Sequence, residues 1–111
     1  MTFVRACSTF DIGEEGVLAV EIEGEQVAVV RSEGEFFAIR DVCSHANVPL
    51  SEGDVEECTI ECWLHGSRFD LRSGKPTGLP ATKPVPIYPV RVEGSNVFVS
   101  LTSVDNQESP Q

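Results

Sequence analysis

The chain has 111 residues, which suffices for one domain with a modest core but is short for an enzyme with its own substrate pocket. Eighteen Asp and Glu residues against eight Lys and Arg residues give a net charge of −10, which argues against binding to nucleic acid or to an anionic membrane surface. The acidity serves either solubility or the electrostatic steering of the protein toward a basic patch on a redox partner.

The first part of the chain, from Thr2 to Arg40, predicts an antiparallel meander. Short β-type runs alternate with Gly/Glu turns, in which glycine is available for positive φ. No 3.6-residue apolar stripe is sustained anywhere, so we expect little helix beyond single turns near 8–13 and 49–53. The predicted strands cover residues 17–22, 26–31 and 35–39.

After Asp41 the composition changes to loops rich in Ser, Pro and Gly, which flank one predicted hairpin of residues 58–62 and 67–71. Five prolines between Pro76 and Pro89 exclude helix there. A last pair of strands, 87–92 and 96–101, is expected to close the base of the domain, and residues 103–111 predict a frayed polar tail. The aliphatic and aromatic residues expected in the core are Val20, Ile22, Val27, Val29, Phe37, Ile39, Val90, Val97 and Val99.

Two short loops each offer one thiolate and one imidazole. The first is Cys43-Ser44-His45, and the second runs from Cys62 to His65. Thiolates suit zinc and the iron of iron–sulfur clusters, and imidazole suits zinc, copper and iron, so the repeated pair predicts a metal site. The chain has two histidines in all, and both lie in these loops.

The order of the ligands favours a cluster over a single ion. A zinc finger usually takes its cysteines from one turn and its histidines from another, whereas each loop here mixes the two types. Mixed loops are needed when one iron binds both cysteines and its neighbour binds both histidines. A zinc site with the same four ligands is the alternative.

The pattern Cys-x-His followed by Cys-x-x-His is that of Rieske centres, in which two histidines replace two cysteines on one iron of a [2Fe–2S] cluster. The chain resembles the Rieske-type ferredoxins over nearly its whole length. Besides the two loops, the likeness rests on Asp41-Val42, Ser73-Gly74-Lys75-Pro76, Pro80-Ala81 and the segment from Tyr88 to Val92.

The resemblance implies an all-β Rieske fold, with an antiparallel β-barrel or sandwich base, an inserted cluster-binding subdomain and little helix. The domain would span residues 1–102, the subdomain approximately 41–84, and the tail 103–111. One Rieske-type [2Fe–2S] cluster per chain is implied. Carried over by position, its ligands are Cys43 and Cys62 on the buried iron, with His45 and His65 on the outer one.

The neighbours of the ligands imply a place in the low-potential ferredoxin group. High-potential Rieske proteins carry a disulfide between the two loops, but the corresponding positions here are Val48 and Leu64. Ser67 matches their serine that hydrogen-bonds a bridging sulfide, and is therefore a candidate for tuning the cluster. Phe69 stands where they have a tyrosine donor, so fewer hydrogen bonds stabilise the reduced state.

Three residues outside the ligand set have two interpretations each. Cys7 and Cys58 are expected to be small buried hydrophobic residues rather than redox groups. For Trp63, packing within the loop is favoured over a place on a partner-contact surface.

The resemblance implies a one-electron carrier without catalytic residues, passing electrons from a flavin-dependent reductase to a terminal oxygenase, such as a dioxygenase, or to another iron enzyme. Alternatives are the Rieske-like small subunit of an assimilatory nitrite reductase and a ferredoxin of iron–sulfur cluster assembly. We expect a cytoplasmic protein, because no apolar run is long enough for a signal peptide or approaches the ~20 residues of a membrane span. We also expect a monomer.

Overall fold

The computed structural model describes residues 3–42, 48–63, 66–77 and 84–101. This part of the chain is built from short antiparallel strands and two single-turn 3₁₀ helices, which confirms the predicted all-β fold. The helices are η1 (Thr9–Asp11) and η2 (Leu50–Glu52), where the sequence predicted turns. The strands are β1 (Phe3–Ser8), β2 (Gly16–Ile22), β3 (Glu25–Ser32), β4 (Glu35–Arg40), β5 (Val55–Glu56), β6 (Thr59–Glu61), β7 (Arg68–Asp70), β8 (Ile87–Tyr88), β9 (Val90–Glu93) and β10 (Asn96–Ser100).

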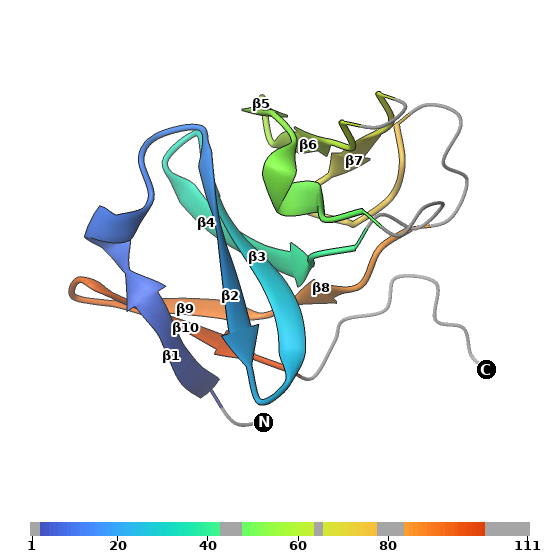
Figure 1. Cartoon of the computed structure of the whole chain (residues 1–111). Helices are drawn as coiled ribbons and strands as arrows, with labels where there is room; N and C mark the ends of the chain where they lie inside the picture. Colours follow the sequence, from blue (N-terminus) through green and yellow to red (C-terminus); the bar gives the residue numbers. More distant parts are fainter. Residues whose placement is uncertain (1–2, 43–47, 64–65, 78–83, 102–111) are drawn as a thin grey trace.

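The strands form three sheets, with the orders β1-β10-β9, β2-β3-β4-β8 and β5-β6-β7. The first two sheets make the base, and the small third sheet lies to one side of it together with η2 (Figure 1). The predicted meander is the β2-β3-β4 part of the second sheet. Its reversals have positive φ at both central residues, 51° and 87° at Glu23 and Gly24 and 52° and 79° at Glu33 and Gly34, as in the tightest hairpin turns.

Strand β3 lies between two layers of core. Residues Val27, Ala28, Val29 and Val30 are all fully buried, although neighbouring residues of a strand point to opposite faces. Val27 and Val29 pack in one apolar cluster with residues of β1 and β10. Ala28 and Val30 pack in a second cluster with residues of η2, β6 and β7. A continuous apolar run in an antiparallel sheet therefore indicates that both faces are covered.

The prediction of one strand over residues 87–92 was wrong. The segment is divided at Pro89, so that β8 pairs with β4 in one sheet while β9 pairs with β10 in another. Proline has no N–H to donate to a ladder, and a break in pairing is expected at this residue. The Pro89 carbonyl still accepts from the Ser100 N–H at 3.1 Å, which joins the corner to β10.

The predicted hairpin of residues 58–62 and 67–71 is confirmed as β6 and β7, and the short strand β5 joins it on the other side. Apolar side chains hold this sheet against the base: Leu50, Ile60 and Phe69 are fully buried in one cluster with Ala28 and Val30. Within the described residues, no helix is long and apolar enough to cross a membrane. The predicted tail of residues 103–111 lies outside the described residues.

Candidate metal centre

Of the four predicted ligands, Cys62 is within the described residues, and Cys43, His45 and His65 lie outside them. Cys62 directly follows β6, is fully buried and belongs to the cluster of apolar residues between the small sheet and the base. A thiolate there would be shielded from water and held at the end of a rigid strand. Among the described residues, no group of three His, Cys, Asp or Glu side chains could hold a metal ion.

Two backbone hydrogen bonds close the loop that begins at Cys62. The Cys62 N–H donates to the Ser67 carbonyl at 2.6 Å, and the Gly66 N–H donates to the Cys62 carbonyl at 2.8 Å. Gly66 has a φ of 80°, a conformation that glycine adopts without steric cost. Ser67 is buried, with 1 % of its surface exposed, and so lies inside the protein beside the Cys62 backbone.

The strand before Cys62 is fixed from both sides. The Glu61 N–H donates to the Asp54 carbonyl at 2.8 Å, and a Cβ on the adjacent Gly53 would overlap the Glu61 carbonyl oxygen. On the other side, Arg68 pairs across the hairpin with Glu61 at 3.5 Å and donates to Thr59 Oγ1 at 2.9 Å. These contacts leave little freedom in the position of the Cys62 backbone.

The segment that contains the first predicted loop is tied at its two ends, a feature that the sequence analysis missed. Asp41 is buried, with 5 % of its surface exposed. Its two carboxylate oxygens accept from the N–H and the hydroxyl of Ser51, at 2.6 and 2.7 Å. The signal in the sequence was a carboxylate two residues before Cys43, together with a proline, whose side chain cannot cap a helix, at the start of the next turn.

The two cysteines outside the motif are buried, as predicted. Cys7 and Cys58 are 4 % and 8 % exposed, and burial raises the pKa of both thiols above the ordinary value. The Cys58 sulfur lies 3.6 Å from both Arg72 Nη2 and Glu33 Oε1, and its backbone N–H donates to Ser32 Oγ at 2.9 Å. A raised pKa disfavours the thiolate, which is the nucleophilic form, and this fits the prediction that Cys58 is a small buried residue rather than a redox group.

Trp63 is only half covered by the rest of the protein. Its side chain is 50 % exposed, although it directly follows the fully buried Cys62. An exposed indole presents both a large apolar surface and an N–H donor, which are the properties of residues enriched in protein–protein contacts. Such exposure is compatible with a place on a contact surface, and both interpretations of Trp63 stay predictions.

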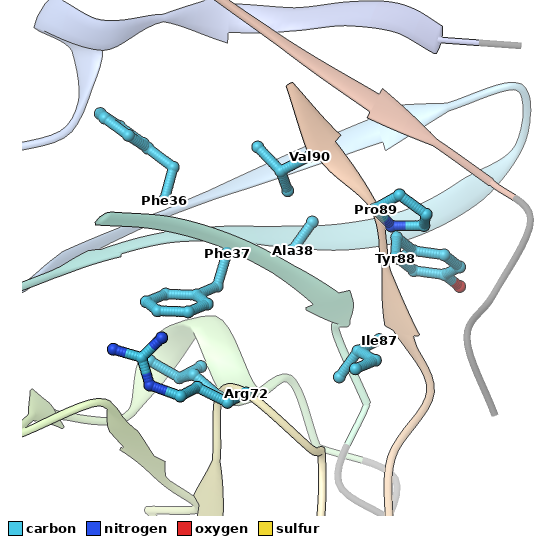
Figure 2. A pocket seen from close by; sticks show the side chains of 9 residues that line it. Phe36, Phe37, Ala38, Arg72, Ile87, Tyr88, Pro89 and Val90 are labelled. Carbon is cyan, nitrogen blue, oxygen red and sulfur yellow. The ribbon is translucent and has the colours of Figure 1, made fainter. Parts of the chain in front are cut away.

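A hollow of about 320 Å³ lies between β4, β8, β9 and the segment after β7, and Cys62, the predicted ligand that the structure describes, does not line it (Figure 2). Among the described residues that line it, the charged side chain is Arg72, which donates to both oxygens of Glu35 at 3.0 Å and lies 5.3 Å from the centre of the Phe37 ring. The same pairing raises the pKa of Arg72 and lowers that of Glu35. The Arg72 cation in the described part of the lining is therefore already paired with a carboxylate.

Comparison with known proteins decides the family. The model of the Rieske [2Fe-2S] domain matches residues 2–89. The 3-phenylpropionate/cinnamic acid dioxygenase ferredoxin subunit of Shigella boydii is 43% identical over 91% of this chain and 95% of its own length. The chain belongs to the Rieske [2Fe-2S] domain family.

Solved structures agree with this assignment. The ferredoxin of carbazole 1,9a-dioxygenase from Nocardioides aromaticivorans IC177 is 37% identical, with a TM-score of 0.85 over 90% of this chain and 98% of that one. A ferredoxin solved in complex with the reduced oxygenase of carbazole 1,9a-dioxygenase is 31% identical, with a TM-score of 0.83 over 88% and 92%. A putative nitrite reductase small subunit also has this Rieske fold, but at 23% identity its TM-score of 0.79 shows the fold alone.

Membership of the Rieske family confirms the predicted cofactor, a Rieske-type [2Fe–2S] cluster. The residues present fit such a cluster chemically. Cys62 supplies a buried thiol at the end of a braced strand, and the sequence supplies one further cysteine and two histidines in the family spacing. Cys7 and Cys58 remain free buried thiols of the Rieske domain.

Proposed function

We propose that this Rieske protein is the ferredoxin component of an oxygenase system, and that it carries one electron at a time from a flavin-dependent reductase to a terminal oxygenase. The observation that carries the proposal is the match to a dioxygenase ferredoxin subunit over nearly the whole length of both chains. The protein is an electron-transfer component rather than a catalytic enzyme. No observation on this chain favours the nitrite reductase or cluster-assembly alternatives.

The cluster would be held by Cys43 and Cys62 on one iron and by His45 and His65 on the other. The burial of Cys62 supports its place on the inner iron, since thiolate sulfur away from water is protected from exchange and oxidation. When bound, the cluster accepts and donates one electron, at a potential above that of four-cysteine clusters because two neutral imidazoles replace two thiolates. The protein's own contribution is to hold the ligands rigidly and to control the hydrogen bonds around them.

The organisation proposed for the chain is a Rieske domain over residues 1–102, a cluster-binding subdomain over approximately 41–84 and a tail over 103–111. The packing of η2, β6 and β7 against one face of the base supports the subdomain.

We propose that the protein is a cytoplasmic monomer, and the three free cysteines among the described residues fit a reducing compartment. The net charge of −10 fits protein partners with basic surfaces better than nucleic acid or membranes.

Electron flow through the purified protein tests the proposed function. A flavin-dependent reductase should reduce it with NADH or NADPH, and a terminal oxygenase should turn over aromatic substrate when all three proteins are present. Omitting the ferredoxin should abolish turnover. Efficient turnover without it, or reduction by the reductase with no onward transfer to any oxygenase tried, would contradict the proposal.

Replacing Ser67 by alanine should lower the reduction potential. If the Ser67 hydroxyl donates to a bridging sulfide, the bond is stronger in the reduced cluster, which carries more negative charge. A hydrogen bond to a charged acceptor contributes roughly 1.5–3 kcal/mol. A difference of about 1–2 kcal/mol between redox states corresponds to about 40–90 mV for one electron. Voltammetry measures the shift directly, and an unchanged potential would show that Ser67 does not tune the cluster.

Replacing Trp63 by alanine should weaken binding to the oxygenase without changing the potential. Aromatic residues at the centre of contacts typically contribute about 2 kcal/mol or more, so we expect the ferredoxin KM to rise about 30-fold or more. The matched control is Phe10→Ala, because Phe10 is 85 % exposed and belongs to η1, the blue turn between β1 and β2 that lies away from the small sheet β5-β6-β7 (Figure 1). Equal effects of the two substitutions on KM would rule out a specific contact through Trp63.

A further inference from the structure

The short helix η2 is capped by a residue from another part of the chain. The helix begins after Pro49, which occupies the N-cap position and makes no side-chain cap hydrogen bond. The Ser51 N–H, one of the amides that a helix start leaves without an internal partner, instead donates to Asp41 Oδ1 at 2.6 Å. The Ser51 hydroxyl donates to the second oxygen, Oδ2, at 2.7 Å. The Asp41 carboxylate therefore performs the capping that Pro49 cannot.

Both partners of this bond are themselves anchored in the base. The Asp41 N–H donates to the Gln26 carbonyl at 3.0 Å, and the Arg40 N–H donates to the Pro86 carbonyl at 3.0 Å. On the other side, Leu50 is fully buried in the apolar cluster that contains Cys62. The Asp41–Ser51 pair thus joins the end of β4 to the start of η2, across ten positions of sequence.

The residues between these two anchors include Cys43 and His45, two of the four proposed ligands. We propose that Asp41 is a positioning residue for the Rieske centre, because its two hydrogen bonds to Ser51 fix the two points of the fold between which Cys43 and His45 lie in the sequence. The inference rests on the proposed function, because it requires Cys43 and His45 to bind the cluster. Its physical basis is that closing a segment at its base removes many of the conformations its ligands could otherwise adopt.

The structure also indicates which substitutions separate geometry from charge. Asp41→Ala removes both acceptors. Asp41→Asn removes the charge but can keep both hydrogen bonds, because the amide oxygen accepts from the Ser51 N–H while the hydroxyl turns to accept from the amide. Ser51→Ala removes the hydroxyl bond at 2.7 Å and keeps the backbone bond. If the hydrogen bonds position the ligands, the effects should be largest in Asp41→Ala, intermediate in Ser51→Ala and smallest in Asp41→Asn.

A matched control exists at the other short helix. Asp11 accepts from the Ser8 N–H at 2.9 Å in the cap of η1, far along the chain from both ligand loops. Asp11→Ala therefore also removes a carboxylate from a 3₁₀ cap. Asp11→Ala should lower thermal stability without altering the cluster. It therefore measures the effect of losing a helix cap that does not contact the ligand segments in sequence.

The test measures the rate of iron loss to a chelator, the EPR spectrum of the reduced protein and the reduction potential in the holoprotein of each variant. Loss of groups that orient metal ligands typically costs 10- to 100-fold in metal affinity, so iron loss from Asp41→Ala should be about 10- to 100-fold faster than from the parent. Its EPR lines should be broader and its potential shifted, because the remaining clusters have less uniform ligand geometry. Asp11→Ala should match the parent in all three measurements.

Two outcomes would overturn the inference. One is an Asp41→Ala protein that loses stability but keeps the parent's iron-loss rate, EPR spectrum and potential. The other is an equal effect of Asp41→Asn and Asp41→Ala, which would assign the role to charge. Failure of the proposed cluster ligation is recognised separately, because the parent protein would then show no Rieske-type EPR signal, and failure of the proposed electron transfer is recognised by the turnover assay with reductase and oxygenase.

Discussion

Replacing Cys62 by alanine is expected to abolish cluster binding, whereas Cys58→Ala should leave the cluster intact. Both thiols are buried and lie four positions apart, at opposite ends of β6. In the proposed centre Cys62 is one of two thiolates on an iron, so its loss leaves that iron without a complete ligand set. Cys58 lies instead beside Arg72 and Glu33, and alanine there removes only a weakly bonded sulfur.

Iron and acid-labile sulfide contents of the two purified variants measure this effect. The Cys62→Ala protein should be colourless, and Cys58→Ala should retain full iron at a cost in stability of roughly 1 kcal/mol. Backbone strain does not distinguish the Cys58 variant from the parent, because cysteine and alanine both carry a Cβ at its φ of 61°. Full cluster content in Cys62→Ala would contradict the ligand assignment.

Gly53→Ala should destabilise the fold strongly and lower cluster content with it. The φ of Gly53 is −96°, which any residue can adopt, so the constraint is space and not backbone conformation. A Cβ would overlap the Glu61 carbonyl, directly before Cys62, and relief requires the backbone of η2 or β6 to move. Overpacking costs about 1–3 kcal/mol when side chains can adjust, and more is expected when backbone must shift, so we expect a loss of at least about 3 kcal/mol.

Gly13→Ala is the matched control, because a Cβ there would meet no atom within 4 Å. It should change the free energy of unfolding by no more than about 0.5 kcal/mol. Denaturant unfolding of the apoproteins, with iron analysis of the holoproteins, gives both quantities. Similar unfolding free energies for the two variants would show that the close approach of Gly53 and Glu61 does not restrain the fold.

The meander β2-β3-β4 and the hairpin β6-β7 could be predicted because residues close together in the sequence specify them. Residues 17–40 combine β-type runs with glycine at Gly24 and Gly34, where positive φ is needed. Strand β5 was missed because its turn to β6 uses Glu57 and Cys58, both at positive φ without a glycine to indicate a reversal. The division at Pro89 was missed because it depends on which sheet each half joins, which is a tertiary property.

The candidate site was predicted at the level of its ligands, since the alternation of cysteine and histidine is visible in the sequence. The contacts around these ligands were not predicted. The bond between Asp41 and Ser51 depends on how the end of β4 meets η2, and the exposure of Trp63 depends on how the loop after β6 lies on the fold. Contacts of this kind arise from packing between segments, and residue type alone does not specify them.

The claim that this chain carries a Rieske cluster is tested most directly by EPR spectroscopy of the dithionite-reduced protein, together with metal analysis. We expect a red-brown protein with two irons per chain. Its signal should be anisotropic, with an average g value below that of four-cysteine [2Fe–2S] clusters, because histidine ligands alter one of the two irons. A colourless protein with stoichiometric zinc, or a signal typical of four cysteine ligands, would contradict the assignment.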